Sequence, residues 1–231
     1  MSTRQPDALL HLLQLASPAL PVGAYAYSQG LESAVEARWI VDEVSAGDWI
    51  GNVMLNSIGR LDAAVLIRLL QAWQKNDTQG VWWWNQLLQA ARESKELLLE
   101  DQQMGDAMQR LLAELGIKAA QQWPLDNDSK NHKPSFATMF ALAAVHWQIP
   151  ALDAIKGFVW SWLENQVAAA VKLVPLGQTQ AQRLLIALMP SIDDAMQIAN
   201  TLDDNDIGSG LPRLALVSMQ HETQYSRLFR S

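Results

Sequence analysis

The stretch ALDAIKGFVWSWLENQVAAAVKLV at residues 151–174 decides the fold class of this chain. Its apolar residues recur three or four positions apart, which places them on one face of an α-helix. They are Leu152, Ile155, Val159, Trp162, Leu163, Val167, Ala170, Val171 and Val174. Pro150 suits the first turn of such a helix, and Pro175 followed by Gly177 ends it. The spacing therefore predicts a long helix with one buried face.

Helical spacing recurs on both sides of this stretch, whereas the alternation typical of strands never persists for more than a few residues. Pro190 should end one helix, after which Ser191 and Asp194 suit the capping box of a short one. Pro212 can open the last helix. The sequence thus predicts an all-α fold, a single compact bundle of roughly ten helices in one domain spanning residues 1–231. We expect helices over residues 7–16, 29–37, 42–57, 61–74, 81–115 (broken near Ser94 or Gly105), 136–147 and 179–189.

The composition suits a helical core and argues against several classes of protein. Hydrophobic residues make up 49% of the 231 positions, only 18% are charged, and the net charge is −7. A protein that binds nucleic acid needs a basic stripe to neutralise phosphates, and no long Lys/Arg run exists. The chain has no cysteine, which excludes disulfides, thiolate metal ligands and a cysteine nucleophile. We expect a cytoplasmic protein with an apolar surface for partners.

Two segments could be mistaken for membrane-directed sequences. Residues 134–152 carry no Asp, Glu, Lys or Arg, but His146, Gln148 and Pro150 interrupt the apolar stretch. We therefore expect no membrane span there. Residues 8–16 follow Arg4 and are rich in leucine. We interpret them as an amphipathic helix, and the alternative is a signal peptide.

A search for catalytic motifs finds none that is complete. The chain has neither a phosphate-binding Gly-x-x-x-x-Gly-Lys-Ser/Thr segment nor a Gly-x-Gly-x-x-Gly turn. His221 and Glu222 begin a His-Glu-x-x-His zinc motif, but its second histidine is replaced by Tyr225. We therefore expect no catalytic residue, metal ligand or cofactor. The alternative is a metal-dependent enzyme whose composite site uses His221, Glu222 and an acid from elsewhere in the chain.

Two segments differ in composition from the predicted core-forming helices. Residues 17–32 combine prolines and glycines with Tyr25 and Tyr27, which provide rigid contact area. Residues 218–231 are rich in polar, aromatic and Arg residues of the kind found at interface hot spots. The first segment is either part of a functional surface or a well-packed connection between helices. The second either becomes ordered on contact with a partner or folds back on the core.

At these segments the chain resembles the UreF family of urease accessory proteins. The resemblance is carried by LASPALPVGAYAYSQGLESAVE at residues 15–36, RESKELLLEDQQMGDAM at 92–108, residues 136–185, and GSGLPRLALVSMQHETQYSRLFRS at 208–231. The first, third and fourth blocks are specific. Three positions depart from the family pattern: Ala26 replaces a hydroxyl residue, Ser33 a tryptophan and Arg38 a glycine.

The resemblance implies an all-α, non-enzymatic protein that acts in urease maturation. Members of this family bridge a UreD-like (also called UreH-like) accessory protein and the nickel-carrying UreG-like GTPase. They dimerise, dock on apo-urease, help to deliver nickel and modulate the GTPase. The resemblance names no nickel ligand in this chain.

The two unusual segments supply the expected partner-binding residues. We predict that residues 211–231 form a partner-docking helix and tail for the UreD-like protein. Its contact residues are His221, Glu222, Gln224, Tyr225, Arg227 and Phe229. We further predict a functional surface near the dimer contact or the GTPase, made of Tyr25, Tyr27, Ser28 and Glu32.

Overall fold

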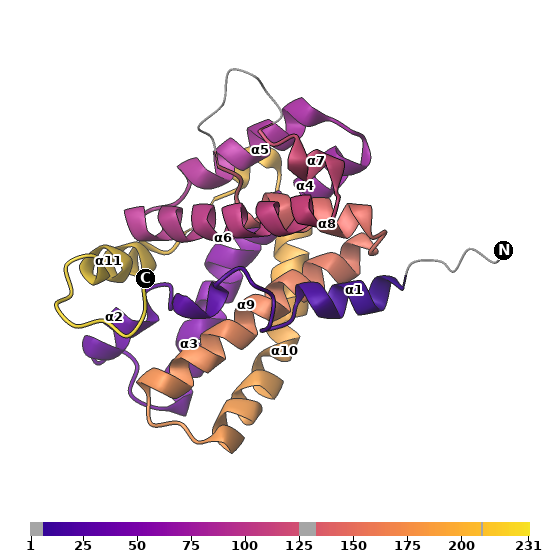
Figure 1. The fold of residues 1–231 in the computed structure, drawn as a ribbon. Helices are drawn as coiled ribbons and strands as arrows, with labels where there is room; N and C mark the ends of the chain where they lie inside the picture. Colours follow the sequence, from indigo (N-terminus) through magenta and orange to yellow (C-terminus); the bar gives the residue numbers. More distant parts are fainter. Residues whose placement is uncertain (1–6, 125–132, 209) are drawn as a thin grey trace.

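A computed structural model describes residues 7–124, 133–208 and 210–231, and within these ranges every regular element is helical (Figure 1). The fold is all-α, as predicted. The elements are α1 (Ala8–Leu15), η1 (Ala24–Ala26), α2 (Leu31–Glu36), α3 (Glu43–Val53), η2 (Met54–Ala63), α4 (Ala64–Gln74), α5 (Thr78–Ala90), α6 (Lys95–Glu114), α7 (Lys118–Gln121), α8 (Phe136–His146), α9 (Ala151–Leu173), α10 (Gln178–Thr201), η4 (Asp204–Asp206) and α11 (Pro212–His221).

Helix α9 lies at the centre of the fold (Figure 1). The residues of its predicted apolar stripe are buried from Ile155 to Ala170 and at Val174, whereas Leu152 is exposed and Val171 is partly buried. Helices α1, α2, α3, α4, α8 and α10 all pack against it. Phe158 of α9 meets Phe140 of α8 edge-on, with ring centres 5.2 Å apart, and stacks near Phe136 at 5.9 Å. These aromatic contacts join α8 and α9 into one wall of the core.

Helices α3 and α4 are one continuous helix joined by η2, so the predicted break between residues 57 and 61 is wrong. The η2 residues form π-helical turns, which are wider than α-helical turns. Asn56, Ser57 and Asp62 make this stretch polar in sequence, which suggests a loop. In the structure Ser57 and Asp62 are buried. The polar side chains therefore face the interior, where other polar groups meet them.

Helix α10 continues through Pro190, so the predicted stop and the capping box at Ser191 and Asp194 are wrong. Proline removes one hydrogen bond from a helix interior. Packing outweighs this loss, because Leu184, Leu188 and Ile192 keep a buried stripe on both sides of the proline. The stripe packs against η2 and α9.

Several predicted helix boundaries are confirmed because they depend on local capping. Asp42 caps α3, Ser135 caps α8 and Pro212 lies at the start of α11. The long helical region predicted over residues 81–115 breaks at Ser94, which caps α6. Gly105 lies inside α6, where the backbone at Pro134 crosses it so closely that a Cβ atom would overlap the Pro134 carbonyl. In the part of the chain that the structure describes, no helix is long and apolar enough to span a membrane.

Candidate functional site

The C-terminal segment, residues 222–231, folds back onto the loop that precedes α2 (Figure 1). Ser28 donates two hydrogen bonds to the carbonyl oxygen of Ser231, from its backbone N–H at 2.7 Å and from its hydroxyl at 2.5 Å. The backbone N–H of Arg230 donates to the carbonyl of Ala26 at 2.8 Å. Of the two interpretations that the sequence leaves open, the structure therefore has this segment folded back on the core.

Glu32, in the first turn of α2, is the side chain that fixes the segment in place. Its two oxygens accept hydrogen bonds from the backbone N–H groups of Leu228 at 2.7 Å and Phe229 at 2.9 Å. One of these oxygens also lies 3.2 Å from Nε2 of His221. Because Glu32 is buried, these bonds replace the water that an ionised carboxylate requires. Glu32 was predicted as a surface residue of the site, and its contacts are instead internal.

His221, at the end of α11, lies fully buried between two carboxylates. Its Nδ1 atom is 2.7 Å from Oε2 of Glu96, while its Nε2 atom faces Glu32. A carboxylate can only accept, so both hydrogen bonds form together when both ring nitrogens carry a proton. Glu96 also pairs with Nη1 of Arg227 at 2.7 Å. We call Glu32, Glu96, His221 and Arg227 the clasp cluster, since it joins α2, α6, α11 and the C-terminal segment.

The other predicted residues of this segment divide between internal contacts and solvent. Glu222 accepts a hydrogen bond from the backbone N–H of Lys95 at 3.1 Å, and Gln224 accepts one from the hydroxyl of Ser33 at 3.0 Å. Phe229 is buried in the core. Tyr225 is fully exposed and is therefore the predicted tail residue most available to a partner.

The alternative of a metal site at His221 and Glu222 gains no support from this geometry. The Glu222 carboxylate bonds to the Lys95 amide, whereas the two ring nitrogens of His221 face Glu32 and Glu96. Across residues 7–124, 133–208 and 210–231, no group of three His, Asp or Glu side chains could hold a metal ion.

The loop before α2 is held in an uncommon backbone conformation by its packing. Gln29 and Gly30 both have positive φ angles, 53° and 80°. A Cβ atom on Gly30 would lie 2.8 Å from Cγ2 of Val217, so the glycine lets α11 approach the start of α2. Tyr27 is buried and donates from its hydroxyl to Oε1 of Gln103 at 2.6 Å. Tyr25 is half-buried, and its burial together with the nearby Glu164 carboxylate raises its pKa to about 12.

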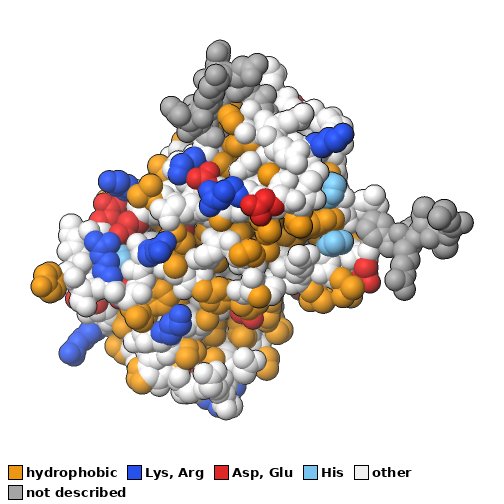
Figure 2. Space-filling view, in the orientation of Figure 1, with side chains coloured by type: hydrophobic (Ala, Val, Ile, Leu, Met, Phe, Trp, Pro, Cys, Tyr) orange, Lys and Arg blue, Asp and Glu red, His pale blue; other side chains and the backbone are white. Residues whose placement is uncertain are grey.

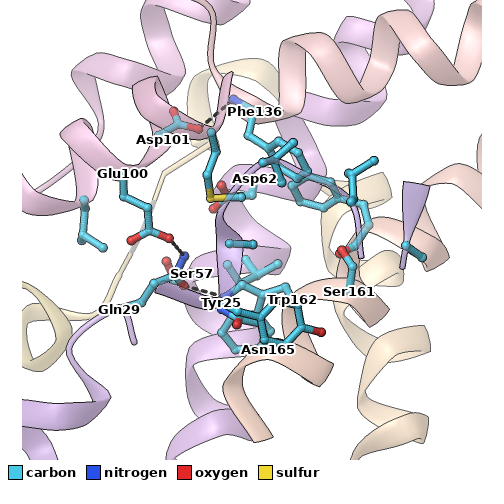
Figure 3. Close-up of a pocket in the computed structure, with 18 of the residues that line it drawn as sticks. Tyr25, Gln29, Ser57, Asp62, Glu100, Asp101, Phe136, Ser161, Trp162 and Asn165 are labelled. Atoms are coloured by element: carbon cyan, nitrogen blue, oxygen red, sulfur yellow. Dashed lines mark hydrogen bonds between the residues drawn. The ribbon is translucent and has the colours of Figure 1, made fainter. Parts of the chain in front are cut away.

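Behind this loop lies a cavity of about 100 Å³ between α6, α9 and η2 (Figure 3). Its wall is largely apolar, but Gln29, Glu100, Trp162 and Asn165 also line it. The indole N–H of Trp162 donates to Oε1 of Gln29 at 2.6 Å, and Nε2 of Gln29 donates to Oε1 of Glu100 at 2.7 Å. A line of hydrogen bonds therefore runs from α9 through the loop to α6. Oδ1 of Asn165 has no partner among the described residues, so the cavity is suited to bound water.

One end of the cavity holds a buried group of charges. Arg92 donates to both oxygens of Asp62, at 2.6 Å and 3.3 Å, and lies 3.5 Å from Oδ2 of Asp101. Burial alone would lower the pKa of Arg92, but the two carboxylates raise it overall. Burial raises the pKa of Asp101, and Arg92 and the Phe136 amide oppose that effect. The arginine therefore stays charged and holds η2 against α6.

Glu100 links the cavity to the C-terminal segment. Its Oε1 atom accepts from Gln29, and its Oε2 atom accepts from the hydroxyl of Ser231 at 2.7 Å. Burial raises the pKa of Glu100 to about 7, although both hydrogen bonds oppose the shift. Sequence reasoning did not single out Glu96 or Glu100. Their spacing of four residues, which puts them on one face of α6, was the available signal.

Exposed apolar side chains occur on several elements, and two regions that carry them lie apart in the fold. Around α11 and the C-terminal segment, they are Leu216, Met219, Tyr225 and Leu228. On the opposite side of the molecule, α1 exposes Leu9, Leu10 and Leu13, and α9 exposes Leu152. Figure 2 shows hydrophobic side chains spread over the face formed by α1 and α9. Exposed apolar surface of this kind marks interaction sites in soluble proteins.

Comparison with known proteins relates the chain to one family along nearly its full length. The family model named UreF matches residues 40–189. The urease accessory protein UreF of Teredinibacter turnerae is 52% identical over 225 residues, covering 97% of this chain and 99% of that protein. The urease accessory protein UreF of Chromohalobacter salexigens is 48% identical over 231 residues, covering 100% and 98%. The chain therefore belongs to the UreF family of urease accessory proteins.

Proposed function

We propose that this chain is a non-catalytic scaffold in the complex that delivers nickel to apo-urease. It bridges a UreD-like protein and a UreG-like GTPase in the cytosol, acts as a homodimer and modulates the GTPase. The observation that carries the proposal is the similarity to urease accessory proteins over 97% of this chain or more. The buried polar groups agree with a scaffold, because the clasp cluster and the Asp62–Arg92–Asp101 group tie helices together.

The surface of α11 and the C-terminal segment is the proposed contact with the UreD-like partner. Its backbone is fixed by Glu32 and Ser28, so it presents Tyr225 and Leu228 from a defined framework. A surface that is already ordered loses less conformational entropy on binding than a free tail would. Tyrosine and apolar side chains on such a framework are typical of interface anchors.

Urease activity in cells tests the maturation role. Cells would express urease and its other accessory proteins with nickel, with and without this chain. Activity that depends on the chain supports the proposal. Equal activity in both, with the chain folded and the other accessory proteins from a compatible source, contradicts it. Mixing the purified chain with the UreD-like protein and the GTPase, followed by size-exclusion chromatography with light scattering, separately tests the bridge and the dimer.

A further inference from the structure

Glu100 occupies the point where the C-terminal segment closes over the protein interior. The side chain is 4% exposed, and Ser231 of the C-terminal segment donates a hydrogen bond to it from its hydroxyl. Ser231 is itself held by Ser28, whose N–H and hydroxyl both donate to its carbonyl oxygen. The docked segment therefore covers one side of the Glu100 carboxyl, and Gln29 and the cavity wall cover the other.

The charges around Glu100 do not compensate for this burial. From the same stretch of chain, Arg92 favours the ionised carboxylate, but Arg92 is already paired with Asp62 and Asp101. Asp101 opposes ionisation of Glu100 because it carries the same charge. From the loop before α2, Tyr27 approaches as a neutral hydroxyl, with Arg230 near it. The groups that bond directly to Glu100, the amide of Gln29 and the hydroxyl of Ser231, are neutral.

We propose that docking of the C-terminal segment is linked to protonation of Glu100, so that the segment is held more tightly in acid and released more readily as pH rises. The reason is desolvation: the segment removes water from a carboxyl group that has no cation of its own, which favours the neutral form. The neutral form keeps both contacts, because the Ser231 hydroxyl can accept the carboxyl proton and Oε1 of Glu100 still accepts from Gln29.

The direction of the linkage follows from burial of the group. In the docked state burial raises the pKa of Glu100 from its ordinary value of 4.5 to about 7, and release of the segment exposes to water the side of the carboxyl that Ser231 covers, which lowers the pKa again. Stability of the docked state is then fully present below the ordinary pKa and is lost as pH rises through 7. Linkage limits the effect to about tenfold in the docking equilibrium per pH unit between these values. If the proposed function holds, the docked surface that would bind the UreD-like partner is more fully formed in acid than at neutral pH.

Amide hydrogen exchange in the isolated full-length chain measures this linkage. The reporters are the N–H groups of Ser28, Leu228, Phe229 and Arg230, whose acceptors hold the segment. After correction for the intrinsic pH dependence of exchange, their protection should fall between pH 5.5 and pH 7.5. Amides in α9 serve as a control for global unfolding and should keep their protection.

A variant separates Glu100 from the other titratable groups. His221, Glu32 and Glu96 also contact the segment or one another, and a Glu100→Gln variant leaves all three unchanged. The variant should lose most of the pH dependence and protect the segment at pH 7.5 as well as the parent chain does at pH 5.5. The same slope in both proteins overturns the proposal.

A direct titration covers the case in which that variant does not fold. The carboxyl carbon of Glu100, followed by NMR in the parent chain, should titrate close to pH 7. In a full-length Ser28→Ala variant, which loses the hydroxyl bond to the Ser231 carbonyl and so holds the segment more weakly, it should titrate at a lower pH. An ordinary carboxyl titration in both chains contradicts the proposal. Both measurements use this chain alone, so their outcome is independent of the urease assay.

Discussion

The carboxylate of Glu32 accepts a hydrogen bond at 2.9 Å from the backbone N–H of Phe229, a residue 197 positions further along the chain. The neighbouring N–H of Leu228 donates to the other oxygen of the same carboxylate. These bonds join the Glu32 side chain to backbone N–H groups, so they do not depend on which side chains stand at positions 228 and 229. The C-terminal segment is thus positioned by its backbone, which leaves its outward side chains free to contact a partner.

Replacing Glu32 with alanine should destabilise the protein. The change leaves two backbone N–H groups without their acceptor and leaves His221 buried beside a single carboxylate. Lost bonds to a buried charged group of this kind cost about 3 kcal/mol of unfolding free energy. Urea denaturation followed by circular dichroism measures the effect.

Glu36→Ala, at an exposed position on the same helix, is the matched control and should leave the midpoint unchanged. Equal midpoints for the two variants would show that Glu32 does not fix the segment.

Replacing Arg92 with methionine should cost more, about 3–5 kcal/mol, because two buried carboxylates lose their cation. Asp62 and Asp101 are both buried, and Arg92 is their common partner. The matched control is Arg183→Met, which removes an exposed pair with Glu43 and should not change stability measurably. A second substitution, Asp62→Asn, should recover part of the loss in the Arg92 variant. If it makes that variant still less stable, the two residues do not act as an ion pair.

Local signals in the sequence identified most helices. The two errors, at η2 and at Pro190, concern helices whose continuity depends on long-range packing. The stripe of α9 and the caps at Asp42 and Ser135 operate within one or two helical turns, so sequence alone predicts them. A proline inside a helix and a cluster of polar residues both favour the end of a helix when only neighbouring residues are considered, as at Pro190 and in η2. Packing of α10 on η2 overrides both, and this packing is not visible from either stretch by itself.

The same division applies to the candidate site. The sequence singled out the two segments that meet, and the structure brings Ser28 and Glu32 into contact with residues 228–231. The roles of individual residues could not be predicted, because Glu32 resembles any acidic residue in the first turn of a helix. Its partners His221, Leu228 and Phe229 lie 189 to 197 positions further along the chain, so its surroundings cannot be inferred from the residues near it in sequence. Glu96 and Glu100 were missed for the same reason, since an acidic helix face is ordinarily solvated.

Adding a methyl group at Gly105 should disrupt the contact between α6 and the chain entering α8. A Cβ atom there would overlap the backbone of Pro134 and Ser135, which cannot move aside as a flexible side chain can. We expect Gly105→Ala to lower the unfolding free energy by about 2–4 kcal/mol, the cost typical of overpacking against backbone.

Gly51→Ala is the matched control, because its Cβ would sit 3.4 Å from Cδ2 of Leu188, an ordinary contact. Since alanine favours helix more than glycine does, that variant should be as stable as the parent or more so. Thermal unfolding of the two variants measures the difference. An equal loss of stability in both would contradict the close approach of the Pro134 backbone to Gly105.

If this surface is the proposed contact with a UreD-like partner, removing the exposed side chains Tyr225 and Leu228 should weaken that binding without affecting the fold. Both are exposed, and the bonds that hold the segment use the backbone of Leu228 rather than its side chain. An interface anchor of this size contributes about 2 kcal/mol or more, so each alanine variant should bind roughly thirtyfold more weakly. Calorimetric titration against the purified partner measures this change, and the melting temperature monitors the fold.

Position 83 provides the matched control for this surface. Trp83 is a large exposed side chain on α5, outside α11 and the C-terminal segment, so Trp83→Ala should leave the affinity unchanged. Deleting residues 222–231 would be a less informative test, because it also uncovers Glu32 and His221 and changes the stability of the chain. Full affinity in both the Tyr225 and Leu228 variants would place the partner on another surface. In that case the exposed face of α1, with Leu9, Leu10 and Leu13, becomes the next surface to substitute.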